Sequence, residues 1–290
     1  MLSDSDLIKL AERYAGPDFI EADPISIPHR YTQKEDIEIA AFCTALISWG
    51  NRRSILRSAQ HWMHLMWDSP YEFVMQAKES ELNSLNGFVH RTFNGTDAKW
   101  LVLRLRSMYQ QEGLEACFSL ALKRESDFGR GLQQFRIRFL QGQDPGRSGK
   151  HLADPVRGSA AKRINMFLRW MVRSDQEGVD FGLWGSISAS QLHLPLDVHS
   201  GTVARELGLL SRKQNDWQSV VELTTRARQV LPQDPAFLDY ALFGMGVEAA
   251  HLKNGKSSVP NSGCILPTQQ SRQHLSAQNS SEKHSAIAHN

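Results

Sequence analysis

Residues 158–173 read GSAAKRINMFLRWMVR and predict a basic helix. At about 100° per residue, apolar side chains fall on one side of this helix, whereas Lys162, Arg169 and Arg173 fall on the other. The small residues that open the segment, beginning with Gly158, would let backbone N–H groups come close to an anion. The segment therefore indicates a phosphate partner, and an ordinary amphipathic helix with solvated cations is the alternative.

A second polar block, residues 193–208, reads HLPLDVHSGTVARELG. Asp197 stands where its carboxylate would accept backbone N–H groups and cap the helix that follows. His193, Asp197 and His199 also carry metal-binding groups, but the spacing H-x3-D-x-H is weakly specific and lacks a fourth ligand. We therefore expect a helix cap here and no metal ion.

The elements that would hold these two blocks are almost all helices. Residues 35–48 open with acids and place apolar side chains at helical spacing, and residues 53–67 repeat this pattern after a turn at 49–52. Pro70 suits the first turn of the next helix. Further helices are predicted at 97–112, 113–122 and 128–140, and a loop at 141–154. Since no segment alternates apolar and polar residues convincingly, the predicted fold class is all-α.

Composition divides the chain into three parts. Residues 1–34 are expected to form an N-terminal extension that packs on the fold, and residues 35–254 the helical domain. Residues 255–290, rich in Ser, Asn, Gln and His, are expected to be a disordered tail. Because the sequence has no secretory signal pattern, no apolar run of spanning length and no closely spaced cysteines, it predicts a cytoplasmic protein without a membrane partner.

The net charge of +2 conceals an uneven distribution. Residues 99–173 carry 15 basic and 6 acidic groups, a balance of +9, whereas residues 1–98 and 174–250 each balance to −5. A basic centre between two acidic arms can build one positive face, which fits a nucleic-acid partner.

The two polar blocks together resemble the helix-hairpin-helix DNA glycosylase superfamily. GSAAKRIN is similar to the hairpin G-V-G-R-K-T-A-N of its endonuclease-three-like members, and LPLDVHSGTVARELGL is similar to V-D-T-H-V-x-R-V-x-x-R-L-G-L. Upstream, EIAAFCTALISWGNRRSI resembles the helix and turn that read L-L-x-A-x-L-S-x-Q-T, and downstream DYALFGMG resembles the closing helix. The likeness covers about residues 35–250, and it extends to the archaeal 8-oxoguanine glycosylases, which also carry a long segment between hairpin and aspartate. It implies two helical subdomains with a cleft between them.

A narrower likeness is carried by the phrases IPHRYTQKEDIEIAAF, KRINMFLRWMVR, VDFGLW and PLDVHS. Together they resemble a bacterial family that is labelled only as a domain of unknown function. Placing that family with the glycosylases is an inference from the motifs quoted above.

The superfamily resemblance implies a DNA repair glycosylase with lyase activity. The lysine matching Lys162 would attack the sugar C1′ and form a Schiff base, and the aspartate matching Asp197 would stabilise the developing positive sugar. The partner would be double-stranded DNA with a damaged or abasic site, bound by a monomer, with the target base extruded from the stack. No cofactor is expected, because the four-cysteine iron–sulfur loop is absent. The residues expected to contact DNA are Asn51, Arg52, Gly158, Ser159, Arg163, Arg169, Arg173 and His199.

Two other functions stay open at this point. The chain could be a non-catalytic nucleic-acid-binding protein on the same scaffold, or a glycosylase-like fold that acts on a nucleotide or RNA.

Residues 174–191 form an insertion relative to the endonuclease-three-like members. Its aromatic residues Trp184 and Phe181 either pack in the core or line a base pocket, and packing in the core is favoured.

Overall fold

The predicted helix at residues 35–48 forms the centre of the core as α3 (Lys34–Leu46). Its first turn carries Glu35 and Asp36, where acids favour the positive end of the helix dipole. Every residue from 37 to 46 is buried, so α3 is covered all round rather than amphipathic.

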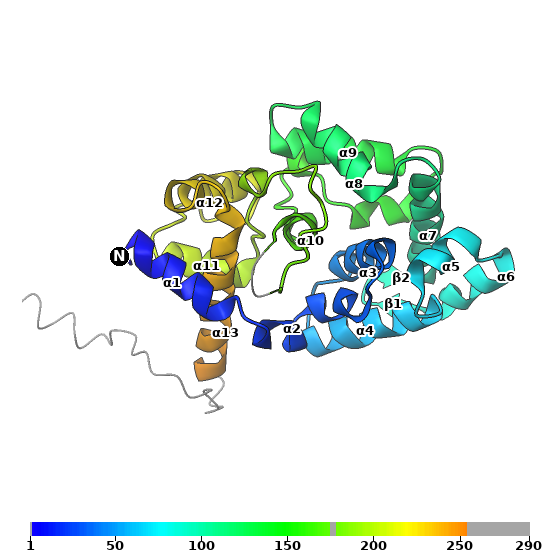
Figure 1. The fold of residues 1–290 in the computed structure, drawn as a ribbon, viewed down its shortest axis with the longest axis horizontal. Coiled ribbons are helices and arrows are strands. Elements are labelled where there is room, and N and C mark those ends of the chain that lie inside the picture. The colour runs from blue at the N-terminus through cyan, green and yellow to red at the C-terminus, as the bar shows by residue number, and fades with distance from the viewer. Residues whose placement is uncertain (1, 175–177, 254–290) are drawn as a thin grey trace, which may run out of the picture. The chain divides into compact units, whose positions relative to one another are not determined.

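A computed structural model describes residues 2–174 and 178–253 (Figure 1). These ranges are mostly helical, which agrees with the all-α prediction, and contacts group Met1–Ala250 into one compact unit. Within them, no helix is both long and apolar enough to cross a bilayer. The predicted tail at 255–290 lies outside the described residues. The other α-helices are α1 (Asp4–Tyr14), α2 (Asp18–Ala22), α4 (Arg52–Leu65), α5 (Pro70–Gln76), α6 (Glu79–Leu82), α7 (Gly95–Tyr109), α8 (Gly113–Lys123), α9 (Phe128–Leu140), α10 (Lys162–Val172), α11 (Val198–Glu206), α12 (Trp217–Val230) and α13 (Asp239–Lys253).

The local sequence rules account for most helix starts. α9 has the predicted bounds, and the Asp127 carboxylate before it accepts the N–H of Arg130 at 2.8 Å. α5 opens at Pro70, as predicted. The expected loop at 141–154 contains a 3-10 helix, η4 (Gly146–His151). The remaining 3-10 helices are η1 (Pro24–Ser26), η2 (Pro28–Arg30), η3 (Asn83–Gly87), η5 (Pro155–Arg157), η6 (Ala189–Gln191) and η7 (Pro235–Leu238).

The sequence does not predict a small antiparallel hairpin, β1 (Val89–His90) paired with β2 (Phe93–Asn94). Each strand is only two residues long, too short for alternation to show. The hairpin turns at Arg91 and Thr92, and Arg91 has a φ of +56°, in the left-handed region.

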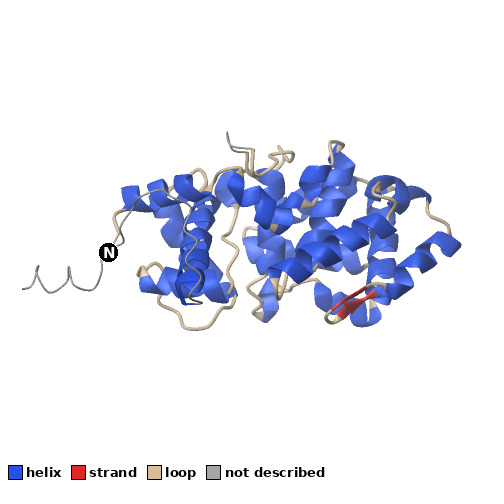
Figure 2. Cartoon of the chain, turned by 90° about the horizontal axis from the view of Figure 1, so that it is seen from below, coloured by secondary structure: helices blue, strands red, loops and turns tan. Residues whose placement is uncertain are grey.

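Helix α10 packs against α3 through aromatic side chains. The rings of Phe42 and Phe167 meet edge to face with centroids 5.1 Å apart. Trp184, from the predicted insertion, is 1% exposed and its indole N–H donates to Glu38 Oε1 at 2.7 Å, so it packs in the core as favoured. Phe181 is half-buried. In Figure 1, α10 lies between helices α3–α9 and the group of α1, α11, α12 and α13, and Figure 2 gives the view from below.

The first helix packs on the last. A Cβ at Gly244 of α13 would lie 2.2 Å from the Tyr14 ring, so only glycine fits under that ring. Arg13 Nη2 lies 3.3 Å from Glu248 Oε1 on the same helix. Residues of the N-terminal segment therefore contribute to the same compact unit as α13.

Candidate functional site

A tight turn brings Lys162 to the first position of α10. Gly158 has a φ of +89°, and Ala161, directly before the helix, has φ +47° and ψ +32°. Glycine adopts this left-handed conformation freely, whereas a residue with a Cβ does so at a cost. The backbone N–H of Trp217 donates to the Gly158 carbonyl at 3.3 Å and ties the turn to α12. Gly158 and Ser159 are exposed on this turn.

An ion pair joins the two residues expected to be catalytic. Lys162 Nζ lies 4.0 Å from Asp197 Oδ2, and their side chains are 28% and 36% exposed. A pair this exposed contributes little to stability. The amine is also within 3.4 Å of Met166 Sδ, one turn further along α10.

Asp197 is fixed by the helix that it caps. Its Oδ1 accepts the backbone N–H groups of His199 at 2.8 Å and Ser200 at 3.0 Å, and the Ser200 hydroxyl accepts the N–H of Asp197 at 2.9 Å. This capping box confirms the predicted cap. Because Oδ1 is engaged by the cap, Oδ2 is the oxygen turned to Lys162.

Two buried acids that the sequence analysis did not predict interact electrostatically with Lys162. Burial raises the pKa of Asp239 to about 6; Arg169 and Lys162 lower it and the charge of Asp197 raises it further. Burial likewise raises the pKa of Asp23, against the opposing charges of Arg169, Arg52 and Lys162. The charge of Lys162 therefore lowers the pKa of both buried acids.

The expected exposed stripe of Lys162, Arg169 and Arg173 is wrong. Arg169 is 2% exposed and Arg173 5% exposed. Arg169 donates to Asp180 Oδ1 at 3.3 Å and to Asp239 Oδ2 at 2.5 Å, and Arg173 also contacts Asp180. The helical pattern placed both arginines on a polar face correctly, but that face is buried against carboxylates from distant segments. Neither guanidinium is accessible to a DNA phosphate.

Asn51 and Arg52, both expected to contact DNA, have different surroundings at the start of α4. Asn51 is exposed and caps α4, its Oδ1 accepting the N–H of Ser54 at 3.3 Å. The Arg52 guanidinium lies 4.8 Å from the centre of the Phe243 ring of α13. The charges of Arg52 and Lys162 both lower the pKa of Asp23.

The two histidines of the second block have different surroundings. His199 is exposed in the first turn of α11. His193 is 7% exposed and lies between the rings of Phe128 and Trp217, with centroids at 4.4 and 5.3 Å. Burial lowers the pKa of His193 to about 4. Among the described residues, no three or more His, Cys, Asp or Glu side chains are grouped so that they could hold a metal ion, and Asp197 is part of no such group.

Arg163, next to Lys162 in the sequence, contacts a different set of residues. It is half-buried, donates to the backbone carbonyl of Leu46 at the end of α3, and donates to that of His151 at 3.1 Å. Its guanidinium stands 4.9 Å from the centre of the Trp49 ring. Arg163 thus ties the start of α10 to the end of α3.

An exposed basic face does exist, but on α4. Arg53 and Arg57 are exposed one turn apart, and neither forms a salt bridge within the part of the chain that the structure describes. The first turn of α4 holds no acid, so its cations stand unneutralised at the positive end of the helix. The spacing of the arginines in NRRSILR was a usable signal for this face.

Comparison with known families places the chain in one of them. Residues 23–248 match the family described as "Protein of unknown function (DUF2400)". The chain belongs to the DUF2400 family. No curated protein and no solved structure matches the chain. The DUF2400 match begins at Asp23 and ends at Glu248, so it includes both Lys162 and Asp197.

Proposed function

We propose that this DUF2400 protein is a cytoplasmic DNA repair glycosylase with lyase activity, acting on double-stranded DNA that carries a damaged or abasic site. The observation that carries the proposal is the 4.0 Å separation of Lys162 Nζ and Asp197 Oδ2. The pair comes from two segments far apart in the sequence, on two helix starts. Both side chains are partly exposed, so a substrate can reach them.

The residue types suit each step of this reaction. Asp197 would take a proton from the Lys162 ammonium, and the free amine would attack the sugar C1′ as the C1′–N bond to the base breaks. The base leaves with the electron pair of that bond and takes the proton from Asp197, which restores the carboxylate. The lysine nitrogen then loses a proton, and its lone pair opens the sugar ring: the C1′–O4′ bond breaks, O4′ is protonated and a protonated Schiff base forms at C1′. Loss of a C2′ proton from this Schiff base breaks the C3′–O bond and releases the 3′-phosphate. A carboxylate 4.0 Å from the amine can also stabilise the positive sugar in the transition state.

The surroundings of the pair supply groups that suit a DNA backbone. Gly158 and Ser159 form an exposed turn on the residues just before Lys162, where backbone groups can approach a phosphate. Asn51 is exposed at the start of α4, and Arg53 and Arg57 extend that helix with positive charge. The two groups of helices on either side of α10 (Figure 1) are compatible with a glycosylase-like arrangement of two subdomains.

Borohydride trapping tests the proposal directly. Full-length protein would be incubated with duplexes carrying an oxidised purine, an oxidised pyrimidine or an abasic site, in the presence of borohydride. We expect a covalent adduct with wild type and with Lys123→Ala, an exposed lysine on α8, and none with Lys162→Ala.

Asp197→Asn separates chemistry from folding, because asparagine caps helices about as well as aspartate but accepts no proton. We expect its trapping rate to fall about 100-fold or more, with unchanged thermal stability. Absence of an adduct with every duplex, or equal trapping by Lys162→Ala, would contradict the proposal. Duplex binding without trapping would favour the non-catalytic nucleic-acid-binding alternative.

A further inference from the structure

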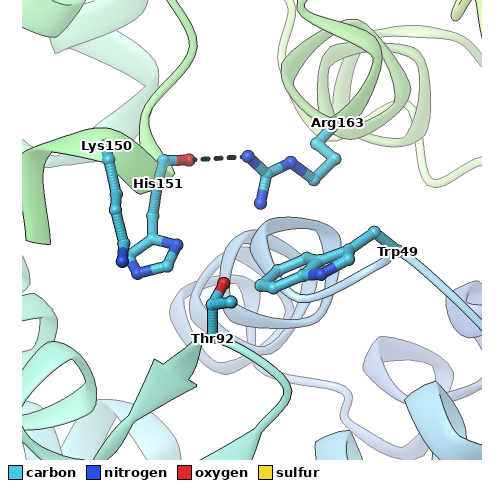
Figure 3. A pocket seen from close by; sticks show the side chains of 5 residues that line it. All are labelled: Trp49, Thr92, Lys150, His151 and Arg163. Carbon is cyan, nitrogen blue, oxygen red and sulfur yellow. Dashed lines mark hydrogen bonds between the residues drawn. The ribbon is translucent and has the colours of Figure 1, made fainter.

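A cavity lies next to the first turn of α10, where Arg163 forms part of its lining (Figure 3). Its volume is about 510 Å³, and its lining residues are Trp49, Thr92, Lys150, His151 and Arg163. They come from four separate segments: the turn after α3, the turn of the β1–β2 hairpin, η4 and α10. The Lys162–Asp197 pair does not line this cavity.

The cation in the wall of this cavity has no acid partner. Arg163 donates to two backbone carbonyls, those of Leu46 and His151, and forms no salt bridge with any carboxylate in the described ranges. A guanidinium carries five N–H donors, so these two bonds leave donors to spare. Burial lowers the pKa of Arg163 to about 10, because no carboxylate in the described ranges pairs with the charge and offsets its loss of solvation.

More positive charge surrounds the cavity. Lys150 is exposed at its edge and has no salt bridge within the described residues. A Cβ at Gly50 would lie 2.5 Å from Arg91 Nη1, so that guanidinium rests against the residue next to Trp49. Thr92, which is exposed, adds a hydroxyl.

The acid beside His151, Asp97, forms no ion pair with Arg163 or Lys150. Asp97 is fully buried and accepts a hydrogen bond from the Ser148 hydroxyl at 2.8 Å. Its Oδ2 lies 3.2 Å from His151 Nε2, out of line for a hydrogen bond, and 3.7 Å from Arg147 Nη2. Burial first, and then the charges of Arg163 and Lys150, lower the pKa of His151, while Asp97 opposes that change. At neutral pH the cavity therefore has cationic walls that do not depend on a protonated histidine.

We propose that this cavity binds an oxyanion of the phosphate type, with Arg163 and Lys150 as its charged donors. A guanidinium and an ammonium on opposite segments suit the several acceptor oxygens of a phosphate. The Thr92 hydroxyl can donate a further hydrogen bond. The site goes beyond the proposed glycosylase reaction, because it is built from residues other than Lys162 and Asp197. Its ligand is either a phosphodiester of a nucleic acid or a free phosphate group.

Calorimetric titration distinguishes these two sources. Inorganic phosphate, thymidine 5′-monophosphate and an undamaged duplex would each be titrated into the full-length protein and its variants. We expect Lys150→Ala to weaken binding about fivefold and Arg163→Gln more, because each removes one charge-assisted contact. For the duplex, each variant should also reduce the salt dependence of the binding constant by about one ion. Lys123→Ala, at an exposed position near the end of α8, is the matched control.

Each result has a definite meaning. Weakening with all three ligands, or with the duplex alone, assigns the site to a phosphodiester or a phosphate of a nucleic acid. Weakening only with inorganic phosphate and the nucleotide assigns it to free phosphate. Unchanged affinity for all three ligands in both Lys150→Ala and Lys150→Glu overturns the proposal, and since Lys150 is exposed these variants should fold even if Arg163→Gln does not. Lys162→Ala should bind inorganic phosphate normally while losing its borohydride adduct, so the two proposals can fail separately.

Discussion

The two ends of α10 carry the same kind of residue in very different settings. At its start, the Lys162 side chain is 28% exposed and faces a partly exposed carboxylate. Towards its end, the side chains of Arg169 and Arg173 are 3% and 6% exposed and are bound to Asp180. Helical spacing indicates which residues share a face, but not whether that face meets water or other charges. The net charge of +9 over residues 99–173 therefore does not show how much positive charge is exposed on the surface.

The largest expected effect follows from removing a buried cation. Arg169→Ala would leave the buried Asp239 without its guanidinium, and Asp180 with one guanidinium, that of Arg173, in place of two. We expect the free energy of unfolding to fall by about 3 to 5 kcal/mol, because an unpaired buried charge is costly. Lys162→Ala should change it by less than about 0.5 kcal/mol, since that lysine is partly exposed. Urea unfolding measures both changes. If the two variants lost equal free energy of unfolding, the two ends of α10 would not differ in how much their cations stabilise the fold.

Much of the fold was predictable because it depends on local signals. α9 was predicted with its bounds, since an Asp cap, an apolar stripe and a following loop all lie within the same stretch. The Asp197 cap was predicted for the same reason. The β1–β2 hairpin was missed because strands of two residues leave no periodic pattern.

The site was less predictable because its partners are distant in sequence. Asp180 and Asp239 neutralise Arg169 from 11 and 70 positions away. Nothing local distinguishes these aspartates from surface acids, so the arginines were assigned to an exposed stripe. The pairing of Lys162 with Asp197 was predicted only through the family resemblance, and the structure brings the two residues together.

An effect of intermediate size is expected at Asp239, which interacts with Arg169 near the end of α10 and with the charge of Lys162 at its start. Its pKa is raised from 3.8 to about 6, burial being the main cause, and it hydrogen-bonds Arg169 while sensing Lys162. An acid with a raised folded pKa binds its proton more tightly in the native state, so stability falls as pH rises from about 4 to about 6. Asp239→Asn removes this titration.

Unfolding free energies of wild type and Asp239→Asn, measured from pH 4 to pH 7, provide the test. Relative to wild type, the variant should gain about 2 kcal/mol across this range, because one unit of pKa corresponds to about 1.4 kcal/mol. The difference between the two proteins isolates Asp239 from the other carboxyl groups. A difference that stays constant with pH would mean that Arg169 holds Asp239 ionised throughout, which would make this end of α10 a plain ion pair.

The smallest expected effect concerns the turn that positions Lys162. Ala161 holds a φ of +47°, a conformation that costs a residue with a Cβ about 1 kcal/mol and glycine very little. Ala161→Gly should raise the free energy of unfolding by up to about 0.5 kcal/mol, since the relief of strain is partly offset by the greater freedom of glycine in the unfolded chain. Gly158→Ala, at a φ of +89°, should instead lower it, and thermal unfolding measures both. If Ala161→Gly lost stability, the Cβ of Ala161, which is 3% exposed, would be stabilising the turn through packing, and the start of α10 would depend on burial as its far end does.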